Sequence, residues 1–187
     1  MPFRPWKTIE EMNEGLIANH NSVISPEDIC IHLGDLVMGS KKNNVPQIIP
    51  RLNGKHILIP GNHCWLPHEI KKPEKLRWYE DLYLANGISQ IAYGTVKLSM
   101  LTNDNKHDKI LMSHFPPKSI DDHYEGREDQ YKKLQHDLQD DEYFLCGHCH
   151  SRQHLLQDRV YHVGCDAEIH EYKPVNLDVV LNRLGLV

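Results

Sequence analysis

The segment from Tyr143 to His150 reads YFLCGHCH. Its first four residues are apolar and predict a short buried strand. The strand ends at a glycine, where the backbone can turn sharply, and two histidines follow within the next three residues. In open α/β sheets, ligands bind beyond the carboxyl ends of the strands. An apolar strand that stops at metal-binding side chains therefore indicates a ligand site at its end.

The same arrangement recurs at three other points of the chain. Strands predicted over 28–33, 56–59 and 109–112 stop at Gly-Asp, at Gly-Asn-His and at Ser-His. Because the carboxyl ends of neighbouring strands meet at one edge of a sheet, we expect the polar residues that follow them to converge. The candidate site residues are Asp35, Asn62, His63, His114, His148 and His150.

The donor types of this set indicate the kind of metal. One carboxylate, one amide oxygen and several imidazoles suit Mn, Fe, Zn or Ni better than Ca or Mg, which favour shells made only of oxygen. The chain has 14 histidines, and those outside the strand ends carry no such pattern. We expect the following to be solvated or hydrogen-bonded surface residues: His20, His56, His68, His107, His136, His154, Lys41 and Lys42.

The remaining pattern predicts a mixed α/β fold. Helices are expected over 8–22, where Thr8 and Glu11 fit a capping box, and over 43–52, 76–86 and 134–138. Strands over 91–93, 95–101 and 109–112 resemble an antiparallel meander, and 143–146 and 160–163 add two more. Residues 179–184 fit a strand or a helix. The loop over 163–168 is a weaker candidate for bordering the site. We expect residues 1–187 to form a single domain.

Composition and charge exclude several classes of function. The formal net charge is −5, with 21 basic against 26 acidic residues, and no basic stripe favours a nucleic-acid partner. The sequence starting at Met1 shows no secretory signal, and no apolar run is long enough to span a membrane. Five cysteines in such a chain predict a reduced, cytoplasmic protein without structural disulfides.

Four blocks of the sequence resemble the calcineurin-like metallophosphoesterases. These blocks are GDLVMG at 34–39, PGNHC at 60–64, LMSHFP at 111–116 and CGHCHS at 146–151. The similarity is greatest to the small bacterial and phage-type members, which the segments RPWKTIEEMNEGLI and VGCDAEIHEYKPVNLDVVL also resemble. The resemblance implies a β-sandwich of mixed sheets flanked by helices, with two metals at the strand ends.

The resemblance also assigns roles to individual residues. Asp35 would bridge the two metals, and Asn62, His114 and His148 would complete the shell of the second metal. The first metal would be bound by His150. The remaining candidate, His63, would contact the substrate phosphate and act as general acid.

These roles describe the hydrolysis of a phosphoester. Two divalent metals roughly 3.5–4 Å apart hold a hydroxide and a phosphoryl oxygen for in-line attack. A nearby imidazole then protonates the leaving alkoxide. The expected substrate is a small phosphodiester or phosphomonoester, while a nucleic acid is not favoured.

The chain departs from the family pattern in two places. The family begins with an apolar strand ending in Asp-x-His, and this chain begins at MPFRPW, with Asp121-Asp122-His123 a poor substitute. One hypothesis is that Met1 is a truncated or misassigned start. The other is a short form that binds one metal, has weak or no activity, and forms homo-oligomers through an exposed sheet edge. The second departure is Cys64, where the family usually has an acidic residue.

Two other hypotheses about function compete with a phosphoesterase. Cys146 and Cys149 form a Cys-x-x-Cys, which is typical of thiol oxidoreductases or, with a second ligand pair, of structural zinc sites. A catalytically weak or inactive family member that acts as a metal-binding or interaction protein is the nearer alternative.

Overall fold

Three short parallel strands form the first of two sheets. The computed structural model describes residues 4–64, 71–101, 107–120 and 133–187. The strands are β1 (Ile29–His32), β2 (Lys55–Leu58) and β3 (Ile88–Ile91), in the order β1-β2-β3. The register places Cys30 opposite His56 and His32 opposite Leu58. Paired residues of neighbouring strands point to the same face, so the register decides which side chains meet.

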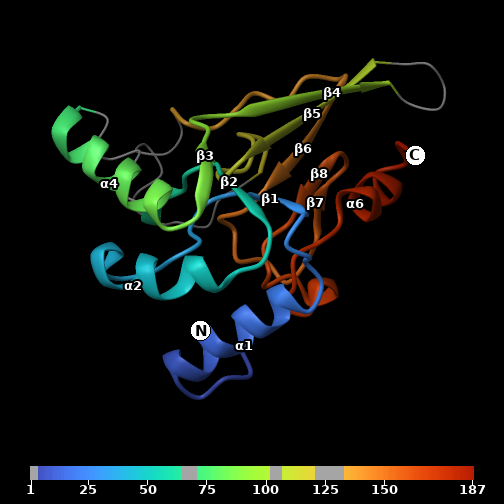
Figure 1. Ribbon diagram of the computed structural model, residues 1–187. Coiled ribbons are helices and arrows are strands. Elements are labelled where there is room, and N and C mark those ends of the chain that lie inside the picture. The colour runs from blue at the N-terminus through green and yellow to red at the C-terminus, as the bar shows by residue number, and fades with distance from the viewer. Residues whose placement is uncertain (1–3, 65–70, 102–106, 121–132) are drawn as a thin grey trace.

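The second sheet is mixed and has the order β4-β5-β6-β8-β7. Its strands are β4 (Val96–Leu101), β5 (His107–Ser113), β6 (Glu142–Cys146), β7 (Leu155–Gln157) and β8 (Val160–His162). The pairs β5–β6 and β6–β8 are parallel, while β4–β5 and β7–β8 are antiparallel. The two sheets lie side by side in Figure 1, and β1, β2, β5 and β6 end near one another.

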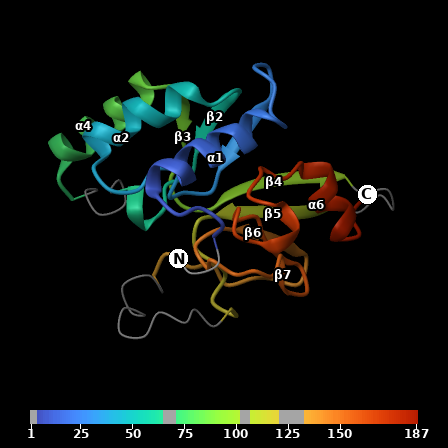
Figure 2. The same cartoon turned by 90° about the horizontal axis from the view of Figure 1, so that it is seen from below.

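Helices cover the outer face of the first sheet (Figure 2). They are α1 (Ile9–Asn21), α2 (Lys41–Ile48), which the short helix η1 (Ile49–Arg51) continues, and α4 (Pro73–Ala85). The predicted cap of α1 is confirmed, because the Thr8 side chain accepts a hydrogen bond of 3.1 Å from the Glu11 amide. A further helix, α6 (Leu177–Arg183), packs against the second sheet, and η3 (Glu168–His170) precedes it.

Two apolar clusters hold these layers together. One joins the ends of β1 and β2 to the second sheet and α6, through Leu33, Ile59, Ile110, Leu145, Tyr161 and Val180 among others. The other lies between the first sheet and its helices and contains Val45, Ile49, Leu58, Tyr83 and Ile88. The predicted fold class, a mixed α/β arrangement of two sheets flanked by helices, is confirmed.

Two predicted elements are wrong. The strand expected at 91–93 is β3, which pairs in parallel with β2 instead of opening an antiparallel meander. Its continuation is fixed by a hydrogen bond from the Ala92 amide to the Leu58 carbonyl. Residues 134–138 form no helix, since the His136 carbonyl accepts instead from the Lys118 amide of another segment. Asp121, Asp122 and His123 lie outside the described residues.

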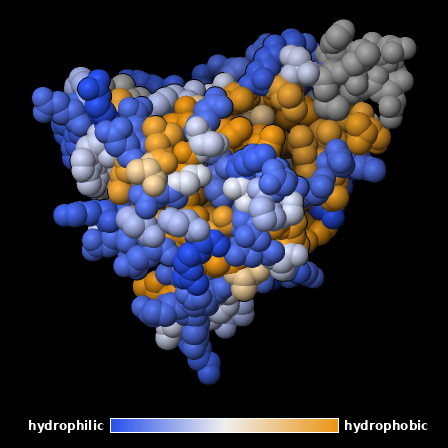
Figure 3. Space-filling model, viewed as in Figure 1, coloured by the Kyte–Doolittle hydropathy of each residue, from blue (hydrophilic) through white to orange (hydrophobic). Residues whose placement is uncertain are grey.

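The strand β1 is an outer strand of its sheet. Its isoleucines are exposed, with 68% of Ile29 and 41% of Ile31 accessible to solvent. Figure 3 shows apolar surface extending from the centre of this view towards the β4–β5 hairpin.

Within the described residues, no helix has the length and apolar character needed to cross a membrane.

Candidate metal centre

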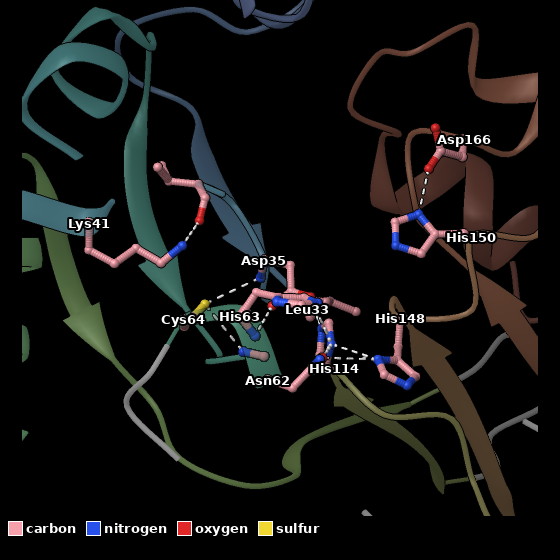
Figure 4. Close-up of polar contacts among 12 residues, drawn as sticks. Leu33, Asp35, Lys41, Asn62, His63, Cys64, His114, His148, His150 and Asp166 are labelled. Atoms are coloured by element: carbon pink, nitrogen blue, oxygen red, sulfur yellow. Dashed lines mark hydrogen bonds and ion pairs between the residues drawn. The ribbon is translucent and has the colours of Figure 1, made fainter. Parts of the chain in front are cut away.

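Four of the predicted site residues bring their donor atoms together at the strand ends (Figure 4). The Oδ1 atom of Asn62 lies 2.8 Å from His114 Nε2 and 3.1 Å from His148 Nδ1. The two ring nitrogens are 3.0 Å apart, and the Asp35 carboxylate is 3.4 Å from His114 Nε2. Donors around one cation with metal–nitrogen bonds near 2.0 Å are separated by roughly these distances. The cluster therefore fits a divalent transition metal.

The protonation state of His114 supports this reading. Its Nδ1 lies 2.7 Å from the Leu33 carbonyl, which only accepts, so Nδ1 carries the proton. Burial lowers the pKa of His114 to about 4, against the opposing effect of Asp35, so the ring is neutral at pH 7. The lone pair on Nε2 then faces a carboxylate oxygen. A lone pair and a carboxylate repel each other unless a cation lies between them, and a metal supplies that cation.

Glycines make this close approach possible. A Cβ atom on Gly61 would lie 2.4 Å from Asp35 Oδ1 and 2.6 Å from the His114 ring. A Cβ atom on Gly34 would lie 2.5 Å from His114 Nδ1, and Gly34 also has a φ of 85°. The turns after β1 and β2 can therefore bring their polar residues onto His114 only with glycine at both positions.

Three candidate ligands hold unusual backbone conformations. The φ angles are 53° at Asp35, 65° at His148 and 47° at His150, in the left-handed region that disfavours side chains. Such conformations cost about 1–3 kcal/mol each and persist where the surroundings enforce them. Their concentration at these residues is typical of a functional site.

The predicted general acid, His63, lies at the open side of the cluster. It belongs to the short helix η2 (Asn62–Cys64), and its amide donates a 2.8 Å hydrogen bond to Asp35 Oδ1. The side chain is exposed, whereas His114 is 2% exposed. The backbone of His63 is thus tied to the cluster while its imidazole remains accessible to a substrate.

Behind this turn, the thiol of Cys64 is fully buried. Its sulfur accepts hydrogen bonds from the amides of Asp35, at 3.2 Å, and Gly61, at 3.4 Å. Burial raises the pKa of Cys64, so the thiol stays neutral. It acts as a packed acceptor that joins the loops following β1 and β2.

His150 lies apart from this group and points towards Asp166 (Figure 4). Its Nδ1 is 2.8 Å from Asp166 Oδ2, and the same carboxylate accepts two hydrogen bonds from Arg4, at 2.7 and 2.8 Å. Burial raises the pKa of Asp166, but the hydrogen bonds from His150 and Arg4 outweigh this effect and hold the pKa at about 2. A histidine held by a carboxylate through one nitrogen presents the other to a metal.

Asp166 is the residue that sequence reasoning missed. It lies in the 163–168 loop, which the sequence offered only as a weak candidate. No local pattern around it predicts a partner 16 residues earlier in the chain, because a loop has no periodicity from which to infer its direction. The signal that the sequence does contain is the block VGCDAEIH, which is part of the segment that resembles the small bacterial and phage-type members of the family.

The prediction for Lys41 is wrong. It was expected on the solvated surface, but it is 4% exposed and its ammonium donates to the Val37 carbonyl. Burial lowers the pKa of Lys41, while the nearby Cys64 and Asp35 oppose this effect. A basic side chain is therefore fixed beside the cluster.

The geometry does not favour a thiol oxidoreductase. Cys146 is the last residue of β6 and is fully buried, and Cys149 is a free thiol between two candidate ligands. In redox proteins with this motif the cysteines open a helix, but residues 147–152 form an irregular loop.

Comparisons with known proteins identify the family of the chain. The sequence profile of the family described as Calcineurin-like phosphoesterase matches residues 5–152. The uncharacterized protein MJ1445 of Methanocaldococcus jannaschii is 27% identical over 187 aligned positions, and the alignment covers 97% of this chain and 80% of that protein. The Gene 66 protein of Mycobacterium phage L5 is 30% identical over 166 aligned positions, and the alignment covers 85% of this chain and 75% of that protein.

One solved structure has a similar fold. It is a protein of unknown function, AQ665 from Aquifex aeolicus, with a TM-score of 0.57 and 23% identity, covering 96% of this chain and 88% of that one. At this level of identity the similarity concerns the fold alone.

The chain belongs to the calcineurin-like phosphoesterase family. This is a family of metal-dependent hydrolases that act on phosphoester bonds, and its small relatives here include an archaeal and a phage protein.

Proposed function

We propose that this chain hydrolyses a small phosphodiester or phosphomonoester at the strand-end cluster. The observation that carries the proposal is the convergence of Asp35, Asn62, His114 and His148, with donor pairs 2.8–3.4 Å apart. When bound there, Mn, Fe, Zn or Ni would supply Lewis-acid activation of water and of a phosphoryl oxygen.

The chain's own residues have distinct tasks in this proposal. Asp35, Asn62, His114 and His148 would hold one cation, and Asp35 and His150 would serve as ligands of a second. The Leu33 carbonyl fixes the proton of His114 on Nδ1 and so keeps Nε2 available. In the same way, Asp166 holds Nδ1 of His150, and Arg4 holds Asp166. Asp166 is a positioning residue.

The exposed imidazole of His63 donates the proton to the leaving alkoxide. Its backbone is fixed by the 2.8 Å hydrogen bond to Asp35, so the ring stands beside the metal ligands. Loss of a general acid lowers rates by roughly 10²- to 10⁴-fold when the leaving group is a poor one. A p-nitrophenolate leaves without help, whereas an alkoxide needs the proton.

This difference gives the test. His63→Ala should lose at least 100-fold more activity on an alkyl phosphodiester than on bis-p-nitrophenyl phosphate, both measured with Mn²⁺. The matched control is His154→Ala, because His154 directly precedes β7 and is not one of the strand-end residues. This variant should leave both rates unchanged. Equal losses on the two substrates would reject His63 as the acid.

The number of metals distinguishes the proposal from its alternative. The alternative is a form that binds a single metal with weak or no turnover, and it is favoured by the separation of His150, which lies apart from the other ligands and contacts Asp166 instead. Elemental analysis of Mn²⁺-loaded protein should give two manganese ions per chain for the enzyme. A value of one, without hydrolysis of either a diester or a monoester, would instead support a metal-binding or interaction protein.

A further inference from the structure

A second group of potential metal ligands lies under α1, on the helix-covered face of the first sheet. Cys30 of β1 and His56 of β2 are opposite each other in the strand register, so their side chains share one face. His20, near the end of α1, reaches the same place. All three residues are buried, with exposures of 7% for His20, 8% for Cys30 and 2% for His56. The prediction that His20 and His56 lie on the surface is wrong.

The ligand atoms of these residues are close enough to share one ion. One nitrogen or sulfur atom from each of His20, Cys30 and His56 lies within 4.8 Å of the other two. A fourth candidate is adjacent, because Nε2 of His32 is 3.0 Å from Nδ1 of His56. Tetrahedral zinc with bonds of about 2.0 Å to nitrogen and 2.3 Å to sulfur separates its ligands by roughly 3–4 Å. Small side-chain movements would close the remaining gap.

Backbone carbonyls from the loop before β2 hold two of the rings. Nε2 of His20 is 2.8 Å from the Asn53 carbonyl, and Nε2 of His56 is 3.3 Å from the Leu52 carbonyl. Metal-ligating histidines are commonly oriented by a carbonyl through the nitrogen that does not bind the metal. The loop approaches closely, since a Cβ atom on Gly54 would be 2.9 Å from the Cys30 sulfur.

The charge state of the cluster suits a metal better than a proton. Burial lowers the pKa of His20 and lowers the pKa of His32 to about 3, so these rings stay neutral and keep a lone pair. Burial also raises the pKa of the Cys30 thiol, and the nearby Asp28 adds to the effect. A cation would reverse this last shift by stabilising the thiolate. The layer between a helix and a sheet is normally apolar. On this face Leu58, the register partner of His32, is fully buried among apolar residues. A group of histidine and cysteine side chains in the same layer is therefore unusual.

We propose that His20, Cys30 and His56 form a second metal site, suited to Zn²⁺, with His32 as the fourth ligand. On binding, the S–H bond of Cys30 breaks, a Zn–S bond forms and one proton passes to solvent, while the imidazoles coordinate as neutral donors. No oxidation state changes. The site ties the end of α1 to β1 and β2 and is independent of the phosphoesterase chemistry at the strand ends.

The test uses Co²⁺ as a spectroscopic substitute for Zn²⁺ in the full chain. After chelation and removal of metals, Co²⁺ is added and the thiolate-to-cobalt charge-transfer band in the near ultraviolet is recorded. The proposal predicts one equivalent of Co²⁺ with this band, which Zn²⁺ abolishes by displacement. Cys30→Ser should lose the band, while Cys149→Ser, in the cysteine beside the strand-end cluster, is the matched control and should keep it.

Two further variants keep the result unambiguous. His56→Gln retains the thiol and should weaken Co²⁺ binding at least tenfold. Asp35→Asn alters only the strand-end cluster and should leave the band unchanged. Absence of the band in the unmodified chain, or its persistence in Cys30→Ser, would overturn the proposal, as would its loss in Cys149→Ser.

Discussion

Replacing Asp166 by asparagine tests the ion pair that positions His150. The carboxylate is 4% exposed and binds both Arg4 and His150, so its ionised form is stabilised in the folded chain. Its pKa falls from 3.8 to about 2. At about 1.4 kcal/mol per pKa unit, the ionised form contributes about 2.5 kcal/mol to stability.

The sign of the pH dependence follows from the lowered pKa. This contribution is complete above the unfolded value near pH 4, and it is lost as the pH falls towards about 2. Asparagine resembles the protonated acid. The difference in unfolding free energy between the unmodified chain and Asp166→Asn should therefore be about 2.5 kcal/mol at pH 6 and much smaller at pH 2.

Urea unfolding of chelator-treated protein, followed by tryptophan fluorescence, measures this difference. The matched control is Asp137→Asn, which breaks the ion pair of Asp137 with Lys118, a pair exposed to solvent. Exposed pairs contribute at most about 1 kcal/mol, so the control should show little change at either pH. A difference for Asp166→Asn that is the same at pH 6 and pH 2, or below 0.5 kcal/mol at pH 6, would refute the reasoning.

Three other predictions follow from the geometry of the cluster. Cys64→Asp should preserve or raise phosphodiester turnover, because the amides of Asp35 and Gly61 already donate to the side chain at position 64 and the buried Tyr83 hydroxyl would gain an acceptor. A loss of more than tenfold in kcat would contradict this prediction. Gly61→Ala should abolish activity and the binding of Mn²⁺ at the strand-end cluster, since its Cβ would lie 2.4 Å from Asp35 Oδ1. Equilibrium dialysis with Mn²⁺ measures this, and unchanged Mn²⁺ binding would be inconsistent with the site. Asp166→Asn should weaken Mn²⁺ binding by about 10- to 100-fold at pH 7, because His150 would lose the carboxylate that orients it. An unchanged Mn²⁺ affinity would exclude the positioning role of Asp166.

The strand ends could be predicted because several local signals agree there. Each apolar strand is followed by glycine or a small residue and then by a ligand type, and parallel strands bring those ends to one edge of the sheet. The structure places Asp35, Asn62, His114 and His148 together as that reasoning requires. Their roles as ligands remain a proposal that the metal measurements decide.

What the sequence could not predict depends on contacts between distant segments. Periodicity indicates that β3 is a strand, but its parallel pairing with β2 depends on how the helix α4 returns the chain to the sheet. In β1 the structure exposes Ile29 and Ile31 and buries Cys30, because Cys30 lies on the face of the sheet that the helices cover. The cluster of His20, Cys30 and His56 could not be predicted either, because it also depends on which face of the sheet the helices cover.

The most direct test of the central claim is Mn²⁺-dependent hydrolysis of bis-p-nitrophenyl phosphate by the chelator-treated chain, compared with Asp35→Asn. We predict no hydrolysis without metal, restored hydrolysis on adding Mn²⁺, and a loss of at least 100-fold in the variant. Hydrolysis that is independent of metal, or that survives unchanged in Asp35→Asn, would contradict the assignment of the strand-end cluster as a phosphoesterase site.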